Sequence, residues 1–317
     1  MSSLPSLFLR FCANNGRVIL VASLLVGLAS GTLASLIKPH INILIAALLF
    51  NACLRVGPKQ VLGAIQDLKL SLLFVLLLQI VMPLGVAIVA ILAGISGPLV
   101  FALVLLTAAP SLSGSPHLVI LMGFDPAPAL RQLVVGTAFL PITIIPILLL
   151  VPEFGDLGEI ALASLKLLVI IVLAAAIAFA IRLTVLKEPG KEIIQQIDGT
   201  STILLSITVV GLMAAIGEEF DSNPTNLFLT LIVSIIANFG LQISTALAMA
   251  RGRFQALSVP IGIISGNRNI ALFLTALPTA TTEPLLLFIA CYQIPMYLTP
   301  IVMRPFFQKL AGSARWR

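Results

Sequence analysis

The sequence predicts an all-α integral membrane protein with ten transmembrane helices, arranged as two inverted five-helix repeats. Three observations predict this class. First, the chain is 59% hydrophobic and only 9% charged over 317 residues, far more apolar than an average soluble domain. Second, apolar runs of about 20 residues, long enough to cross a ~30 Å hydrocarbon layer, recur throughout. Third, two of these runs are interrupted by polar segments that contain glycine or proline.

The ten predicted spans follow one another with short connections and leave no room for a large soluble domain. They cover residues 17–36, 40–57, 68–93, 97–124, 127–151, 158–186, 199–217, 225–250, 255–278 and 284–307. The fourth and ninth spans contain the interruptions, so these two helices are predicted to be broken.

The net charge of +6 is distributed unevenly along the chain. With the N-terminus placed inside, fifteen of the 18 Lys and Arg residues fall on the cytoplasmic side, Lys38 alone falls outside, and Lys166 and Arg268 lie within spans. Cytoplasmic loops carry the excess of Lys and Arg in membrane proteins. Both termini are therefore predicted in the cytoplasm of a multi-pass protein of the cell (inner) membrane. The expected macromolecular partner is the lipid bilayer and not nucleic acid.

An internal repeat relates the two halves of the chain. The fifth span contains Pro141 and Pro146, and the tenth contains Pro295 and Pro300, so both prolines recur after 154 positions. The same offset carries the first interruption onto the second. An odd number of spans per unit means that units 1–156 and 157–317 enter the membrane from opposite sides, as in many secondary transporters. The alternative is coincidence, because proline and glycine are frequent in membrane helices.

The two interruptions are the predicted binding site. Non-helical backbone at membrane depth is tolerated only where protein buries it or water reaches it. A half-helix that begins there points a partial positive charge and free N–H groups at the midplane, which favours an anion. Serine and proline are typical helix starts, so Ser115 is predicted to cap a half-helix over 116–124, and Asn267 or Gly266 one that ends at Leu277. The predicted substrate-binding residues are Ser113, Gly114, Ser115, His117, Gly266, Asn267, Arg268 and Asn269.

Arg268 is the most informative single residue. A charge at membrane depth costs about 2.5–3.5 kcal/mol on insertion scales, so it normally faces the bundle interior. Two interpretations stay open. The guanidinium contacts a substrate carboxylate or stands where a cation would bind, or it satisfies backbone carbonyls of the facing break. The intramembrane amides, Gln79 among them, are equally compatible with helix-to-helix hydrogen bonds.

Enzyme signatures are missing from the sequence. It contains no HExxH, GxSxG, P-loop or dinucleotide fingerprint. No cluster of Cys and His indicates a metal site, and the three cysteines are expected to be free thiols. We therefore expect neither enzymatic activity nor a cofactor, and any pumping would draw on an ion gradient.

These segments resemble the bile acid:sodium symporter family over nearly the whole length of the chain. The resemblance rests on the order and spacing of Leu78–Pro83, Ala109–Pro116, Leu165–Leu167 and Ser265–Asn269. It implies a ten-helix fold with a panel domain (spans 1, 2, 6 and 7) and a core domain (spans 3–5 and 8–10), whose broken fourth and ninth helices cross at the substrate site. It also implies sodium-coupled uptake of organic anions by alternating access.

The chain departs from this family at the implied sodium ligands. The family's glutamate falls at Ile264 or Ser265, its ninth-helix glutamine falls at Arg268, and its fourth-helix asparagine falls at Pro116. Two hydroxyl ligands fall at Ala129 and Leu133. The positions that remain for ion binding are Gln79, Ser115, Ser265 and Arg268, the last as a substitute for the cation. Since a hard cation prefers several oxygen ligands, the resemblance here implies weak or absent sodium coupling.

A symporter-like carrier of a small organic anion is the leading prediction. A related efflux carrier or a uniporter shares this architecture, although the arsenite type would place a cysteine where this chain has Ala108 and Ala109. A channel would require a continuous polar lining. A non-transporting receptor would show no flux at all.

Overall fold

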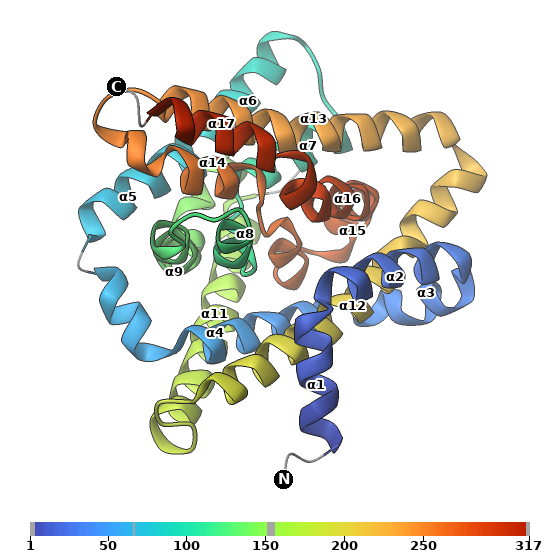
Figure 1. Cartoon of the computed structure of the whole chain (residues 1–317). Coiled ribbons are helices and arrows are strands. Elements are labelled where there is room, and N and C mark those ends of the chain that lie inside the picture. The colour runs from blue at the N-terminus through green and yellow to red at the C-terminus, as the bar shows by residue number, and fades with distance from the viewer. Residues whose placement is uncertain (1–3, 66, 151–155, 315–317) are drawn as a thin grey trace.

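The computed structural model describes residues 4–65, 67–150 and 156–314 (Figure 1). These residues are almost entirely helical. The α-helices are α1 (Leu4–Asn14), α2 (Gly16–Ala29), α3 (Gly31–Ile37), α4 (Ile41–Ile65), α5 (Leu68–Leu76), α6 (Met82–Leu92), α7 (Pro98–Ala108), α8 (Ser115–Leu121), α9 (Ala127–Thr143), α10 (Ile145–Leu148), α11 (Leu157–Thr184), α12 (Lys191–Ser222), α13 (Pro224–Met249), α14 (Ser258–Gly266), α15 (Thr279–Thr282), α16 (Leu286–Val302) and α17 (Arg304–Ala314).

Shorter helical segments of other types join them. The 3-10 segments are η1 (Lys38–His40), η4 (Gly252–Leu257), η5 (Ile270–Thr275) and η6 (Glu283–Leu285), and η2 (Leu77–Val81) is a π-helical segment. No strand forms within the described residues apart from an isolated bridge between Ser111 and Arg268. The all-α class is therefore confirmed.

The described helices include six that are long and apolar enough to cross a membrane, or seven if the bent pair that begins with α1 is counted as one. The six cover residues 31–64, 68–92, 157–184, 191–222, 224–249 and 279–302. The other predicted spans are divided among shorter pieces, and residue 151, the predicted end of the fifth span, lies outside the described residues. Multiple spanning helices are thus confirmed, whereas the number ten remains a prediction.

Two groups of helices pack separately over much of their length. In the lower part of Figure 1, α12 packs against α1, α2, α3 and α4, and α4 also packs against α11. In the rest of the molecule α13 packs against α14 and α16, α5 against α9, and α8 against both α9 and α14. The two groups meet where α4 contacts η5 and α9, where α11 contacts α9, and where α12 contacts α16. This meeting of the groups places the interrupted helices beside α4 and α11.

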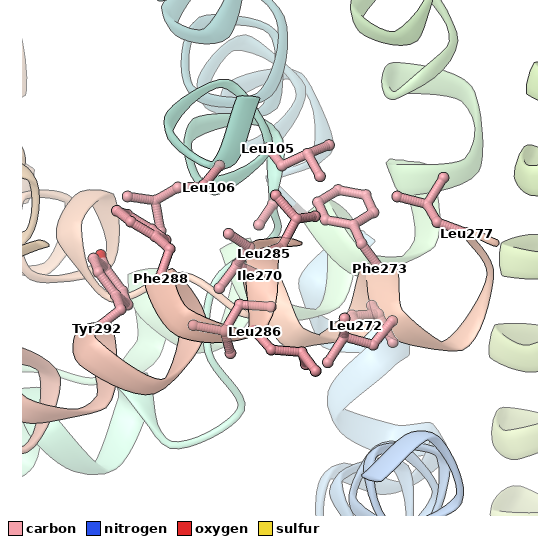
Figure 2. Packing of buried hydrophobic residues seen from close by; sticks show 14 of the residues in the cluster. Leu105, Leu106, Ile270, Leu272, Phe273, Leu277, Leu285, Leu286, Phe288 and Tyr292 are labelled. Atoms are coloured by element: carbon pink, nitrogen blue, oxygen red, sulfur yellow. The ribbon is translucent and has the colours of Figure 1, made fainter. Parts of the chain in front are cut away.

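The segment after the second interruption is held by apolar packing. Ile270, Leu272 and Phe273 of η5 are at most 2% exposed and belong to one buried cluster with Leu105 and Leu106 of α7. Figure 2 shows side chains from α7, η5 and α16 converging in this cluster. Burial of aliphatic and aromatic side chains contributes about 1.5–3 kcal/mol each. The packing fixes the position of η5 although its 3-10 hydrogen bonds are weaker than those of an α-helix.

Charged side chains pair at the two ends of the helices. Lys38, predicted outside, contacts Glu218 and Glu283, each at 2.9 Å. At the other end, Arg10 pairs with Glu192 at 3.1 Å. Further pairs of basic residues predicted to be cytoplasmic are Arg55 with Asp198, Lys59 with Glu188, and Arg131 with Asp67. The pairs are consistent with the predicted separation of the two faces.

Candidate functional site: the crossing of two interrupted helices

The two interruptions meet inside the molecule. The break between α7 and α8 lies antiparallel to the break between α14 and η5, with a bridge between Ser111 and Arg268. The N–H of Leu112 donates to the carbonyl of Asn267 at 2.9 Å, and the N–H of Asn269 donates to the carbonyl of Pro110 at 2.9 Å. These bonds supply partners that the broken helices lack, and we call this pairing of the two breaks the crossing.

Proline explains why the first helix breaks. Pro110 follows Ala109, the C-cap residue of α7, whose extended backbone (φ −62°, ψ 150°) is the conformation favoured before proline. Pro116 then lies in the first turn of α8, where a missing N–H costs nothing. The half-helix predicted over 116–124 forms, but it begins one residue earlier, at Ser115, and ends at Leu121.

The predicted capping roles are wrong at both breaks. The N-cap residue of α8 is Gly114, without a side-chain cap, because the Ser115 hydroxyl donates instead to the carbonyl of Asn267 at 3.3 Å. At the second break, Asn267 is the C-cap of α14, and its side-chain amide donates to the carbonyl of Ile263 at 2.7 Å. The segment that follows is the 3-10 segment η5 (Ile270–Thr275), not an α-helix that ends at Leu277.

Arg268 lies at the centre of the crossing and is 3% exposed. Its Nη1 donates to the carbonyl of Ala109 at 2.9 Å, and its Nη2 donates to the carbonyl of Leu78 at 3.3 Å. Its Nε donates to the carbonyl of Ser265 at 2.9 Å. The carbonyls of Ala109 and Ser265 lie at the C-terminal ends of α7 and α14, where the helix dipole is negative. The guanidinium therefore occupies a site that suits a cation, and its predicted contact with carbonyls of the facing break is confirmed.

A π-helical turn frees the third carbonyl. In an α-helix the N–H of Met82 would bond to the carbonyl of Leu78, four residues earlier. Here it bonds to the carbonyl of Leu77, five residues earlier. Pro83 has no N–H to donate, which weakens the regular ladder at this point. The widened turn leaves the carbonyl of Leu78 for Arg268, which supplies a charge-assisted hydrogen bond.

A buried polar network satisfies the carbonyl of Gly266 in the second break. The carbonyl of Gly266 accepts hydrogen bonds from the amide of Asn238 and the hydroxyl of Tyr292. Gln242 donates to the Thr299 hydroxyl at 3.1 Å. That hydroxyl lies 3.3 Å from the side-chain oxygen of Asn267. The network ties α13 and α16 to the end of α14, so Asn238 and Gln242 link helices, which is one of the two roles that the sequence left open for intramembrane amides.

Glycine is required at position 266 by close approach. A Cβ at Gly266 would lie 2.1 Å from the carbonyl oxygen of Asn238 and 2.5 Å from the side chain of Gln242. Any side chain would displace α14 from α13. The sequence signal for Gly266 was its place in a polar interruption. Tyr292 carried no such signal, because a single tyrosine in an apolar span resembles an ordinary core residue.

Two of the predicted ion-binding residues, Gln79 and Ser265, form side-chain hydrogen bonds with groups other than the Arg268 guanidinium. Gln79 is 3% exposed, and its side-chain oxygen accepts a hydrogen bond from Thr143 at 3.0 Å. The Ser265 hydroxyl faces α13, where it lies 2.8 Å from the carbonyl of Leu241. Within the described residues, no group of three or more His, Cys, Asp or Glu side chains lies close enough to hold a metal ion.

Burial divides the predicted substrate-binding residues into two sets. The buried residues are Ser115, Gly266, Asn267 and Arg268. The accessible or partly accessible residues are Ser113, Gly114, His117 and Asn269. The first set builds the crossing, and only the second presents polar groups at its surface. A ligand at the crossing would meet the second set first.

The composition and the long apolar helices together define a multi-span helical membrane protein. Neither a scan against protein-family models nor a search of curated proteins found a match to this chain. The resemblance to the bile acid:sodium symporter family therefore stays a prediction.

Proposed function

We propose that this chain is a secondary transporter that carries a small organic anion across the membrane by alternating access. The observation that carries the proposal is the buried antiparallel crossing at Ser111 and Arg268. Irregular backbone in a membrane protein is stable only inside protein or beside an aqueous cavity. Paired interruptions in the two halves of such a protein mark the binding site of transporters with repeated folds.

In this proposal the chain has ten spans in two inverted units, 1–156 and 157–317, with both termini in the cytoplasm. The panel domain comprises α2–α4, α11 and α12, and the core domain comprises α5–α10 and α13–α16. This division follows the two groups of helices that pack together. The anion binds between them, against Ser113, His117 and Asn269, which are the accessible polar side chains of the crossing.

The same proposal assigns Arg268 to the place of a coupling cation. All three nitrogens of its guanidinium donate to backbone carbonyls. The guanidinium is therefore not assigned to substrate binding. A sodium ion in place of the guanidinium would be coordinated by the same carbonyl oxygens, because hard cations bind carbonyl groups. Transport is therefore expected to proceed without sodium, as a uniport or in exchange for another anion.

Purified protein in proteoliposomes tests the proposal. Thermal-shift screening against carboxylates and sulfonates selects a ligand, since ligand binding stabilises the folded state. Uptake of that ligand is then measured in sodium and in choline buffer. We expect saturable uptake at equal rates in both. Strict sodium dependence would refute the role of Arg268 but not transport, whereas binding without flux would support a receptor.

Site variants localise the binding. His117→Ala and Ser113→Ala should raise KM severalfold, because both residues lie at the accessible side of the crossing. Ser244→Ala, which removes an exposed serine on α13, is the matched control and should leave KM unchanged. Unchanged KM in both test variants would place the binding site elsewhere.

A further inference from the structure

Arg182 is a second buried arginine, far along the chain from the crossing. It lies in the last turn of α11 and is 9% exposed. Its Nη1 is fully buried and has no hydrogen-bond partner. The ion pairs among the described residues do not include Arg182. A buried charge is normally paired, since removing it from water without a partner is costly.

The neighbouring helix is shaped around this guanidinium. Gly57 of α4 has φ 71° and ψ 166°, a conformation that breaks the helix and that glycine adopts most easily. A Cβ at Gly57 would lie 2.6 Å from Nη2 and 2.8 Å from Cζ of Arg182. The guanidinium thus rests against backbone where no other residue fits. Pro58 follows Gly57 and begins a new helical segment, whose first-turn N–H groups lie at the break.

The two basic residues that flank Gly57 on α4 each have an acidic partner. Arg55 pairs with Asp198, and Lys59 pairs with Glu188. Their charges are compensated within the protein, so the uncompensated charge at this break is that of Arg182. One guanidinium and a helix start make a site for a singly charged oxyanion, which arginine binds through charge-assisted hydrogen bonds.

The depth of the site indicates which oxyanion. Arg182 lies near the end of α11, a 28-residue apolar helix. That length exceeds the hydrocarbon layer of ~30 Å, so its last turn reaches the head-group level. The adjacent Leu183 and Val185 are 60% and 76% exposed, as expected of side chains that face lipid. Phosphate groups of lipids are concentrated at this depth, and basic sites between helices bind anionic head groups.

We propose that Arg182 and the Gly57 break bind a phosphate group, supplied by an anionic phospholipid head group that holds α4 and α11 together. The proposal is independent of the transport function. A free phosphate ion has the same chemistry, and the experiment separates the two sources.

The test uses the full-length protein in a zwitterionic detergent. Thermal unfolding and native mass spectrometry are measured with phosphatidylglycerol, with phosphatidylcholine and with inorganic phosphate. The variants are Arg182→Gln and, as the matched control, Lys187→Gln, which removes one positive charge from an exposed site at the same end of α11. We expect wild type and Lys187→Gln to retain and be stabilised by phosphatidylglycerol, with at least a tenfold weaker affinity in Arg182→Gln.

The outcomes are distinct. Stabilisation of wild type by phosphatidylglycerol alone supports the head group, whereas equal stabilisation by inorganic phosphate supports a free anion. Equal binding of phosphatidylglycerol by wild type and Arg182→Gln would overturn the proposal. Should Arg182→Gln fail to fold, photo-crosslinkable phosphatidylglycerol on the wild-type protein replaces it. Labelling of the peptides around residues 57 and 182 supports the site, and labelling confined to other helices overturns it.

Discussion

The substitution Arg268→Ala is the sharpest test of how the crossing is held together. It leaves three buried carbonyl oxygens without their donor, those of Leu78, Ala109 and Ser265. An unsatisfied buried polar group costs about 1–3 kcal/mol, so the three together cost about 3–9 kcal/mol. Removal of the buried charge returns part of its desolvation cost, which lowers the expected net destabilisation to about 3–5 kcal/mol.

Thermal unfolding in detergent measures this loss. A destabilisation of this size should lower Tm by roughly 6–15 °C. The Tm of Arg268→Lys should lie between those of wild type and Arg268→Ala, because a lysine ammonium keeps the charge but lacks the planar fork of arginine. Arg251→Ala is the matched control, since Arg251 is exposed and its removal should change Tm little. An unchanged Tm in Arg268→Ala would refute the structural role of the guanidinium.

The effect of sodium on Tm tests whether the Arg268 guanidinium occupies a cation-binding site or serves only as a hydrogen-bond donor. In Arg268→Ala the three carbonyl oxygens surround a vacated cation site, and such oxygens suit a hard cation. We expect sodium to raise the Tm of Arg268→Ala relative to choline, and to leave wild type unchanged. If sodium stabilised wild type as strongly as the variant, the guanidinium would not be standing in the ion's place.

Two glycine substitutions test close helix approaches. Gly266→Ala places a Cβ 2.1 Å from a carbonyl of α13 and should destabilise by about 1–3 kcal/mol, whereas Gly240→Ala on α13 meets open space and should stabilise by up to about 1 kcal/mol. Gly199→Ala places a Cβ 2.0 Å from the carbonyl of Leu9 and should detach α1 from α12, which limited proteolysis of the N-terminal segment would detect. Gly217→Ala, on the same helix but in open space, is its control. Equal effects within either pair would contradict the packing described here.

The sequence was informative where structure follows from local chemistry. Apolar runs predicted the long helices, because a chain in lipid must satisfy its own backbone. Pro110 and Pro116 predicted the first break for a similar reason, since proline lacks an N–H. The repeat offset identified the second break as the counterpart of the first, and in the structure a bridge between Ser111 and Arg268 joins the two breaks. Arg268 was identified because a charge is rare in such surroundings.

The sequence was uninformative where a residue's role depends on a distant partner. The π turn at Leu77–Val81 leaves the carbonyl of Leu78 free for Arg268, 190 residues away. No sequence feature near Leu78 indicates this contact. Ser115 has the local character of a cap, yet the carbonyl of Asn267 takes its hydroxyl. The 3-10 geometry of η5 likewise depends on packing against α7 and α16. These contacts join segments whose proximity exists only in the folded chain.

The hydrogen bonds that join the two breaks constrain how the proposed transporter moves. Separating the two breaks would leave the carbonyls of Ala109, Pro110 and Asn267 unpaired at once. Because each unpaired group is costly, the core should move as one body against α4, α11 and α12. Lys38 joins the two groups at one end, since Glu218 belongs to α12 and Glu283 to η6.

Rigid-body movement then requires the contact of Lys38 with Glu283 to break, while the contact with Glu218 persists. A short thiol cross-linker between Lys38→Cys and Glu283→Cys, in a chain without its three native cysteines, should therefore stop transport. The same cross-linker between Lys38→Cys and Glu218→Cys should leave transport intact. Transport that continues with the first pair cross-linked would show that this end of the molecule does not open, and the proposed division into two moving bodies would fail.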